Sequence, residues 1–335
     1  MVRNRHHGKF NLTMSVKQQL NQRLQDAASL RKSGKLDEAG DILRSLETDP
    51  DISELGQQTA LGLPRRLQSA LLKLAKAEKD VIRSIAYQYN LVPPPDLLTH
   101  YARIPSSERR SLVEANRVPV PRTIHQIWIG SNPVPAGTEA WQTHAQANGY
   151  DYRLWREENL QELGITTMPV YIDMLSRGDF PGAVDVARYV ILSHFGGIYL
   201  DCDWYPTRHD ISFHDFLPLT GLSAMAEAIP RNTGKGGLLL ANSLIAAPPQ
   251  HPVFSRIIDV IDRVAADLPK APAWWSTGPL IFTLVARSGS LTLIDEDFVA
   301  GALPQDTPMP TVEAFCSEAQ AQNKGLLLAW KSWVW

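Results

Sequence analysis

The chain has 335 residues, of which 44% are hydrophobic and 20% are charged, so it is neither intrinsically disordered nor fibrous. Its 33 lysines and arginines nearly balance its 35 aspartates and glutamates, which excludes a strong overall attraction to nucleic acid or acidic lipid. The balance is uneven, because residues 1–120 hold 19 basic and 13 acidic residues and the remainder holds 14 and 22. The length and this asymmetry predict two domains of different electrostatic character.

Residues 1–118 are predicted to form an all-α domain with a linker. Strong helix formers over 15–47, interrupted at 32–35, predict a helical hairpin, and about residues 23–50 resemble one tetratricopeptide repeat. No second copy follows, so we expect a helical bundle and not a repeat array. A second amphipathic helix is expected over 64–89, ended by the prolines at 93–95, and the composition of 105–121 is typical of a connection between domains.

The basic N-terminal helices have two interpretations from the sequence. They form either an interaction module, which docks an acceptor protein or touches an anionic membrane peripherally, or a cap that packs on the second domain.

Residues 119–335 are predicted to form an α/β domain, because short apolar runs alternate with helical segments. Strands are expected at 123–129, 152–155 and 198–200, and helices at 139–147 and 180–195. Gly196 and Gly197 would end the second of these helices, and the strand after them leads directly into Asp201-Cys202-Asp203.

Asp201 and Asp203 follow that apolar strand two residues apart, so strand alternation places both carboxylates on the same side of the chain. Paired carboxylates are typical ligands of a hard divalent cation such as Mn²⁺ or Mg²⁺. A lone D-x-D is frequent on protein surfaces, but the preceding helix carries Asp185 and Arg188 at i and i+3, on one face. The pattern predicts a cation site at which three acidic groups and one arginine converge.

The runs DVARY at 185–189 and FGGIYLDCD at 195–203 closely resemble the DXD-motif sugar-nucleotide glycosyltransferases. Within that group, the chain resembles the initiation-specific mannosyltransferase-like and capsular polysaccharide enzymes of glycosyltransferase family 32, and more distantly the large clostridial glucosylating toxins. Further matches follow in order: IHQIWIG at 124–130, YRLW at 152–155, Asn242 upstream of His251-Pro252, and STGP at 276–279. The resemblance covers about residues 121–335.

The resemblance implies a GT-A fold, which is a Rossmann-like nucleotide-sugar-binding domain, and a set of site residues. The residues with implied catalytic roles are Asp185, Arg188, Asp201 and Asp203. The implied donor-binding residues are Ile127, Trp128, Ile129, Tyr189, Tyr199, Asn242 and Trp333. Asp203 and Asp201 would bind Mn²⁺ or Mg²⁺. Many family members complete the metal shell with a histidine before a final Ser-Trp, and since residues 328–333 contain none, either Ser332 or water would take the third ligand position.

The implied reaction is metal-dependent transfer of a sugar from a nucleotide-diphosphate donor to a glycan or protein acceptor, with retention of configuration. The resemblance favours UDP-hexose or UDP-N-acetylhexosamine over GDP-mannose. The acceptor is left open between a polysaccharide, a lipid-linked sugar and a protein side chain. An alternative is a phosphatase of the haloacid dehalogenase class, which also places D-x-D after an apolar strand and binds Mg²⁺.

Several of these residues have a purely structural interpretation as well. Trp128 is also expected as a core aromatic, Asp185 with Arg188 as a surface ion pair, and Asn242 as an ordinary turn residue. His125 and His251 are expected to be structural, because neither has a second histidine or cysteine at ligand spacing.

Two groups of tryptophans are interpreted in the same way. Trp274 and Trp275 would line an acceptor cleft or pack in the core, and Trp330, Trp333 and Trp335 would close over the donor or pack on the core.

Localisation is predicted from the cysteines and the apolar runs. Two cysteines are too few for a disulfide framework, and no apolar run reaches the roughly 18 residues that a spanning helix needs. Residues 1–14 also lack the apolar core of a signal peptide. We expect a cytoplasmic protein of bacterial type or an effector exported without a signal peptide.

Overall fold

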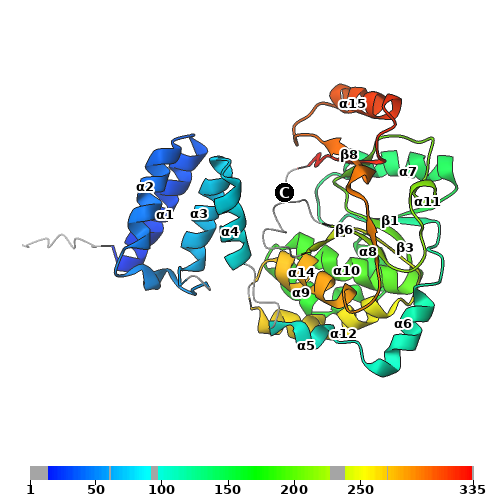
Figure 1. Ribbon diagram of the computed structural model, residues 1–335, viewed down its shortest axis with the longest axis horizontal. Coiled ribbons are helices and arrows are strands. Elements are labelled where there is room, and N and C mark those ends of the chain that lie inside the picture. The colour runs from blue at the N-terminus through cyan, green and yellow to red at the C-terminus, as the bar shows by residue number, and fades with distance from the viewer. Residues whose placement is uncertain (1–13, 60–61, 92–96, 227–237, 270, 334–335) are drawn as a thin grey trace, which may run out of the picture. The chain divides into compact units, whose positions relative to one another are not determined.

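The computed structural model describes residues 14–59, 62–91, 97–226, 238–269 and 271–333. The described residues form two compact units, one up to residue 91 and the other from residue 97 on. The first unit is helical, and the second combines helices with strands, as Figure 1 shows. The predicted fold class, an α/β domain preceded by an all-α region, is therefore confirmed.

The first unit contains the predicted helical hairpin. Its helices are α1 (Val16–Lys32), α2 (Leu36–Glu47), the 3₁₀ turn η1 (Ile52–Leu55), α3 (Arg65–Ala77) and α4 (Val81–Leu91). Ser15 begins α1 with a capping box to Gln18, and Gly34, with a φ of 80°, allows the turn into α2. The apolar faces meet in one core, made of Leu20, Leu24, Ala27, Ala39, Leu43, Leu46, Leu55, Leu67, Leu71 and Leu74.

The helix predicted over 64–89 is two helices in the structure. Lys79 adopts a left-handed φ of 58° and ends α3, and the Asp80 side chain accepts a hydrogen bond from the Arg83 backbone N–H at 2.9 Å at the start of α4. Ile82, which the sequence pattern places on the apolar face, is 82% exposed because the break rotates α4 relative to α3. The prolines at 93–95 lie outside the described residues.

The second unit is built from short helices around two sheets. Its helices are α5 (Thr99–Ala102), η3 (Ser106–Glu108), α6 (Arg109–Ala115), α7 (Ala136–Asn148), α8 (Glu157–Glu162), η4 (Ile165–Thr167), α9 (Pro169–Ser176), α10 (Phe180–Phe195), α11 (Phe213–Phe216), α12 (Pro252–Asp267), α13 (Ala273–Ser276), α14 (Pro279–Ala286), η5 (Glu296–Phe298) and α15 (Met309–Ala321). Its strands are β1 (Thr123–Ile127), β2 (Asp151–Trp155), β3 (Gly197–Leu200), β4 (Trp204–Pro206), β5 (Ser223–Ala226), β6 (Leu240–Ala247), β7 (Thr292–Ile294), β8 (Val299–Ala302) and β9 (Leu327–Ala329). The helices and strands predicted between 123 and 200 are confirmed, with bounds that differ by a few residues.

The main sheet has six strands in the order β2-β1-β3-β6-β5-β7, and the smaller sheet has the order β4-β9-β8. In the main sheet β1 is parallel to both β2 and β3, whereas β6 is antiparallel to its neighbours β3 and β5. The carboxyl ends of β1 and β3 therefore lie at the same edge as the amino end of β6. This edge positions the candidate site.

The predicted domain boundary near residue 118 differs from the structure, in which residues 97–118 belong to the second unit. The Tyr101 hydroxyl donates a hydrogen bond to Asp267 at 2.6 Å, and Arg256 donates to the Tyr101 carbonyl oxygen. Leu98 and Leu112 are buried as well. Composition alone made this segment resemble a linker, whereas its few apolar side chains anchor it to α12 and its surroundings.

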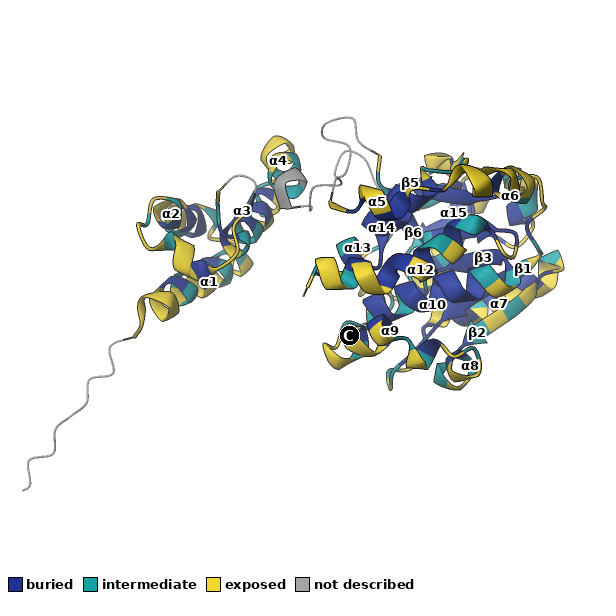
Figure 2. Ribbon diagram, turned by 90° about the horizontal axis from the view of Figure 1, so that it is seen from below, coloured by how far each residue is buried: buried dark blue, intermediate teal, exposed yellow. Residues whose placement is uncertain are grey.

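Burial in the second unit is concentrated on α10, α14 and the inner strands β3 and β6 of the main sheet, and α10 is mostly dark blue in Figure 2. All four residues of β3 are buried, as expected for a strand between two neighbours. No described helix combines the length and the apolar character needed to span a membrane.

Candidate active site

The site begins where α10 turns into β3. Gly196 and Gly197 adopt φ values of 61° and 93°, which favour glycine. A Cβ on Gly196 would lie 2.5 Å from the Pro249 backbone nitrogen, and one on Gly197 would lie 2.7 Å from the Thr123 carbonyl oxygen. Only glycines therefore allow the helix to end against the sheet and the strand to begin at once.

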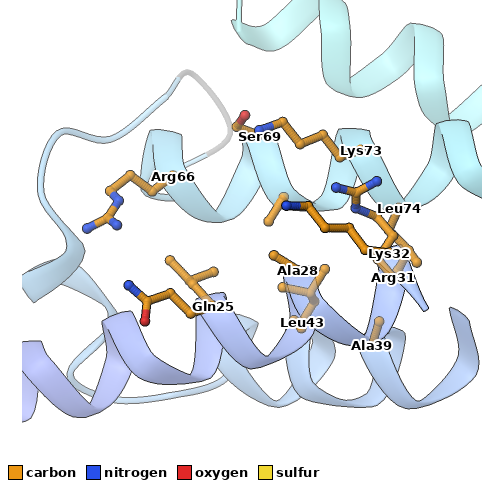
Figure 3. Close-up of a pocket in the computed structure, with 13 residues that line it drawn as sticks. Gln25, Ala28, Arg31, Lys32, Ala39, Leu43, Arg66, Ser69, Lys73 and Leu74 are labelled. Atoms are coloured by element: carbon orange, nitrogen blue, oxygen red, sulfur yellow. The ribbon is translucent and has the colours of Figure 1, made fainter. Parts of the chain in front are cut away.

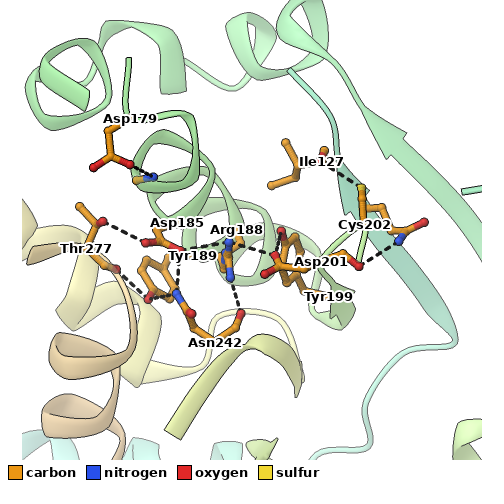
Figure 4. Close-up of polar contacts among 12 residues, drawn as sticks. Ile127, Asp179, Asp185, Arg188, Tyr189, Tyr199, Asp201, Cys202, Asn242 and Thr277 are labelled. Carbon is orange, nitrogen blue, oxygen red and sulfur yellow. Dashed lines mark hydrogen bonds and ion pairs between the residues drawn. The ribbon is translucent and has the colours of Figure 1, made fainter. Parts of the chain in front are cut away.

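Arg188 on α10 is the centre of a buried ionic network, drawn in Figure 4. Its Nη2 lies 3.0 Å from Asp185 Oδ1 and 3.1 Å from Asp201 Oδ1, and its Nη1 donates to the Asn242 carbonyl oxygen. The guanidinium carbon lies 4.5 Å from the ring centroid of Tyr199, whose hydroxyl donates to Asp201 at 2.7 Å. The helix and the two strands thus fix one arginine between two carboxylates.

Asp185 is enclosed by hydrogen-bond donors. Asn242 Nδ2 donates to its Oδ1 at 2.7 Å, and the Thr277 hydroxyl donates to its Oδ2 at 3.0 Å. Burial raises the pKa of Asp185 to about 7, although Arg188 favours its charged form. The side chains of Asp185 and Arg188 are only 7% and 3% exposed, so their interpretation as a surface ion pair is wrong.

Asn242 reaches this network because β6 runs antiparallel to β3. Leu244 pairs with Leu200, and the Asp201 N–H donates to the Ser243 carbonyl oxygen at 2.9 Å, so the start of β6 lies beside the end of β3. Asn242 also donates to the Tyr189 hydroxyl at 3.2 Å. The structure therefore makes Asn242 a buried member of the network and not an ordinary turn residue.

The two aspartates of the D-x-D sequence differ in their contacts. Asp201 accepts from Tyr199 and pairs with Arg188, whereas Asp203 Oδ1 is buried without a hydrogen-bond partner among the described residues. Burial, followed by the neighbouring charge of Asp201, raises the pKa of Asp203 to about 7. A buried carboxylate oxygen without a donor fits a divalent cation. Within the described ranges no cluster of three or more acidic, histidine or cysteine side chains surrounds it, so other ligands would come from the substrate or water.

A hollow of about 320 Å³ opens at this edge of the sheet. Its lining residues come from β1, α10, β3 and later segments: Ile127, Trp128, Ile129, Pro181, Val184, Arg188, Tyr199, Asp201, Cys202, Asp203, Trp274, Lys331 and Trp333. Eight of the predicted site residues are in this lining. Asp185, Tyr189 and Asn242 are not, because they lie buried behind Arg188 and fix its orientation.

The predicted aromatic residues separate into different roles. Trp128 is buried and also lines the hollow, where its ring meets Trp333 edge-on at a centroid distance of 5.2 Å. Trp274, 38% exposed, is also in the lining. Trp330 instead packs in a small core with Val312, so it is not part of a cover over the donor. Trp335 lies outside the described residues.

Lys331 is a site residue that the sequence analysis missed. It lines the hollow, its Nζ lies 5.7 Å from the Trp333 ring centroid, and its charge favours the ionised form of Asp203. The signal was its position next to Ser332 in the stretch that replaces the missing histidine. Ser332 itself lines a neighbouring hollow with Asn132 and Pro135, so its role as a metal ligand stays a prediction.

Two histidines and a cysteine of the second unit are structural. His125 donates from Nε2 to the Gly196 carbonyl oxygen at 2.9 Å and accepts at Nδ1 from the Trp155 ring N–H at 3.1 Å. Its burial lowers its pKa to about 4. His251 caps α12 by accepting from the Val253 N–H. Burial raises the pKa of the Cys202 thiol, which keeps it protonated and excludes it as a nucleophile.

Residues 137–216 match the family described as "Glycosyltransferase sugar-binding region containing DXD motif". A mannosyl phosphorylinositol ceramide synthase of Saccharomyces cerevisiae is 29% identical over 174 residues, which are 50% of this chain and 42% of that protein. An inositol phosphoceramide mannosyltransferase of Schizosaccharomyces pombe is 29% identical over 177 residues, which are 50% and 44% of the two chains. The chain thus spans less than half the length of these curated relatives.

Among solved structures, the chain is similar to a PaToxG glycosyltransferase, with a TM-score of 0.41 and 16% identity, over 68% of this chain and 83% of the other. The family match includes α10 and the D-x-D sequence, and it confirms the resemblance predicted from those residues.

Proposed function

Because the chain carries a DXD glycosyltransferase sugar-binding region, we propose that its second unit transfers a hexose from a nucleotide-diphosphate sugar to an acceptor hydroxyl. The observation that carries the proposal is the D-x-D pair beside the buried Arg188 in one hollow. Two buried polar atoms there, Arg188 Nε and Asp203 Oδ1, have no partner among the described residues, so the hollow offers both a donor and an acceptor to a ligand.

In this proposal Asp203 and Asp201 would hold Mn²⁺ or Mg²⁺. A divalent cation supplies positive charge to the diphosphate oxygens and stabilises the leaving group as its negative charge develops. Lys331 adds a further positive charge to the lining of the hollow. Arg188 presents a guanidinium whose orientation is set by Asp185 and Asn242, which suits the binding of sugar hydroxyls or phosphate oxygens.

Retention of configuration is the stereochemical outcome that we propose. The only carboxylates in the described lining are Asp201 and Asp203, which are assigned to the cation. An inverting transfer would need a further general base for the acceptor hydroxyl, and a double displacement would need a carboxylate nucleophile. Their absence from the described lining supports attack by the acceptor on the face from which the diphosphate departs.

The donor sugar that we propose is mannose. The names of both curated relatives refer to mannosyl transfer, and they favour GDP-mannose over the UDP sugars that the sequence resemblance placed first. UDP-hexoses remain the second candidate, because Trp128 and Trp333 form an aromatic wall that accepts either base. The acceptor proposed is a hydroxyl of a glycan, with a protein hydroxyl as the other possibility.

The test is a panel of GDP-mannose, UDP-glucose, UDP-galactose and UDP-N-acetylglucosamine, each with Mn²⁺ or with EDTA. A true donor at a hundred times its dissociation constant adds about 2.7 kcal/mol to the free energy of unfolding, and it should be hydrolysed slowly without acceptor. The expected result is a thermal shift and hydrolysis with GDP-mannose and Mn²⁺ alone. Phosphate release from a simple phosphoester, with no response to any nucleotide sugar, would instead establish the phosphatase alternative.

A further inference from the structure

A second hollow, of about 290 Å³, lies in the first unit between α1 and α3, with α2 beneath it. Figure 3 shows Arg31, Lys32 and Lys73 around one end of it and Arg66 at the other. We propose that this hollow binds an acidic peptide segment of a partner protein. The proposal is independent of the reaction catalysed by the second unit.

Helical periodicity forms the two walls. On α1 the lining residues Leu24, Gln25, Ala28, Arg31 and Lys32 recur at the spacing of one helix face. On α3 the lining residues Arg66, Ser69, Ala70, Lys73 and Leu74 recur in the same way. Two rows of side chains, one from each helix, thus flank the hollow along at least two helical turns, or about 10 Å. We call this elongated hollow the channel.

The floor of the channel is apolar and combines alanines with leucines. Ala27 and Ala39 are buried there beside Leu43, and Ala28 and Ala70 are partly exposed on the walls. Small residues let another backbone approach closely. A ligand would therefore place a short apolar side chain between the walls, and a hollow of this volume has room for only a few such groups.

The rim of the channel carries charge of one sign. Its lining contains four cationic side chains and no aspartate or glutamate. Arg31, Lys32 and Lys73 form no ion pair with any residue that the structure describes, and Arg66 donates only to the neutral side chain of Asn21. Elsewhere in the same unit the basic side chains Arg23, Arg44 and Arg83 each pair with an acid. The rim is therefore complementary to carboxylates that the unit itself does not supply.

The shape of the channel favours a peptide over other anionic partners. A bilayer surface is broad, so it would meet the cationic rim without reaching the buried alanine and leucine floor. Nucleic acid would stack its bases on aromatic side chains, and none is present in this lining. A peptide with carboxylates on either side of small apolar residues satisfies both the rim and the floor.

The experiment uses the full chain, immobilised, and a pool of short synthetic peptides in which Glu alternates at random with Ala, Leu or Val. A second pool has Lys in place of Glu. We expect retention of the acidic pool at low salt and at least about tenfold weaker retention by the double variant Lys32→Glu with Lys73→Glu. The matched control is Lys17→Glu with Lys76→Glu, which makes the same charge change on α1 and α3 outside the lining.

Two further measurements distinguish peptide binding in the hollow from a nonspecific attraction to positive charge. Ala70→Phe, which fills the hollow without changing the charge, should weaken retention of the acidic pool and leave donor hydrolysis unchanged. Vesicles of phosphatidylcholine with phosphatidylserine are offered in parallel. Equal retention of both peptide pools, an equal loss in the control variant, no retention at all, or binding of the vesicles alone would each overturn the proposal.

Discussion

The hollow beside the D-x-D pair and the hollow between α1 and α3 have similar volumes, about 320 Å³ and 290 Å³, but opposite electrostatic organisation. In the second unit, Arg188 is buried between two carboxylates, and the charges hold each other in place. In the first unit, Lys32 and Lys73 are exposed cations without ion pairs among the described residues. Paired buried charges orient groups for chemistry, whereas unpaired charges of one sign attract a partner. The hollow of the second unit is therefore the proposed catalytic site, and that of the first unit is the proposed docking site.

The largest effect is expected from replacing Asp203, which tests whether the hollow of the second unit is catalytic. Asp203→Asn keeps the shape of the side chain but removes the charge that holds the cation, so donor hydrolysis should fall by about 10³-fold or more. Asp151→Asn, on the exposed start of β2, is the control and should retain full activity. The measurement is the turnover of GDP-mannose at saturating Mn²⁺. Unchanged turnover in the Asp203 variant would remove the D-x-D pair from the proposed mechanism.

The second prediction concerns the contribution of Arg188 to the free energy of unfolding. Replacing it by Met leaves the buried Asp185 and the half-buried Asp201 without their counter-charge, which should lower the free energy of unfolding by about 3–5 kcal/mol. Arg44→Met on α2 breaks an exposed pair with Asp41 and should have no measurable effect. Urea denaturation at neutral pH compares the two. If Arg188→Met lowers the free energy of unfolding only slightly, the ionic network around Arg188 does not stabilise the fold as expected.

The third effect depends on pH and concerns His125. Its pKa is near 4 in the folded protein and 6.5 in the unfolded chain, so its contribution to stability is complete above pH 6.5 and is lost as the pH falls toward 4. His125→Gln should be less stable at pH 7, and its deficit should shrink by up to about 3 kcal/mol between pH 6.5 and 4. The nearby Arg153 acts in the same direction as burial.

The control for His125 is His194→Gln, which makes the same substitution at an exposed histidine on α10. Thermal unfolding across that pH range gives both curves. A constant deficit for His125→Gln would show that the ring is protonated equally in the folded and unfolded states.

The smallest effect is expected at Lys331, the one exposed cation assigned to the catalytic hollow. Lys331→Gln should raise the KM for the donor about tenfold, which corresponds to about 1.4 kcal/mol, with a smaller change in kcat. Lys324→Gln, an exposed lysine outside this lining, should change neither constant. If both variants behave alike, Lys331 belongs to the general surface charge and the contrast between the hollows weakens.

The sequence predicted those parts of the site that depend on neighbours along the chain. The helix over 180–195, the glycine turn and the strand before Asp201 form one continuous run whose local geometry follows from residue type. Asn242 was found only through the family resemblance, because its contact with Asp185 depends on the antiparallel pairing of β6. The residues around Asn242 do not by themselves indicate which strand β6 pairs with.

The incorrect predictions concern segments whose position depends on contacts with residues that are distant in the sequence. Residues 105–121 have the composition of a linker, but the packing of Leu98 and Leu112 and the hydrogen bonds of Tyr101 attach residues 97–118 to the second unit. The break between α3 and α4 did leave a signal, since Asp80 is a favoured residue for a helix start. The only sequence signal for Lys331 was its position next to Ser332, because the orientation of a single lysine in a segment without helical or strand periodicity cannot be predicted.

The turn at Gly196 and Gly197 has a consequence for ligand binding. The turn joins α10 directly to β3, and an ion pair links Arg188 to Asp201, so these groups are positioned before any ligand binds. The conformational entropy of these groups is therefore lost when the protein folds and not when the donor arrives. A donor would meet a preorganised inner wall, and adaptation to different sugars would be confined to the outer wall formed by Trp274, Lys331 and Trp333.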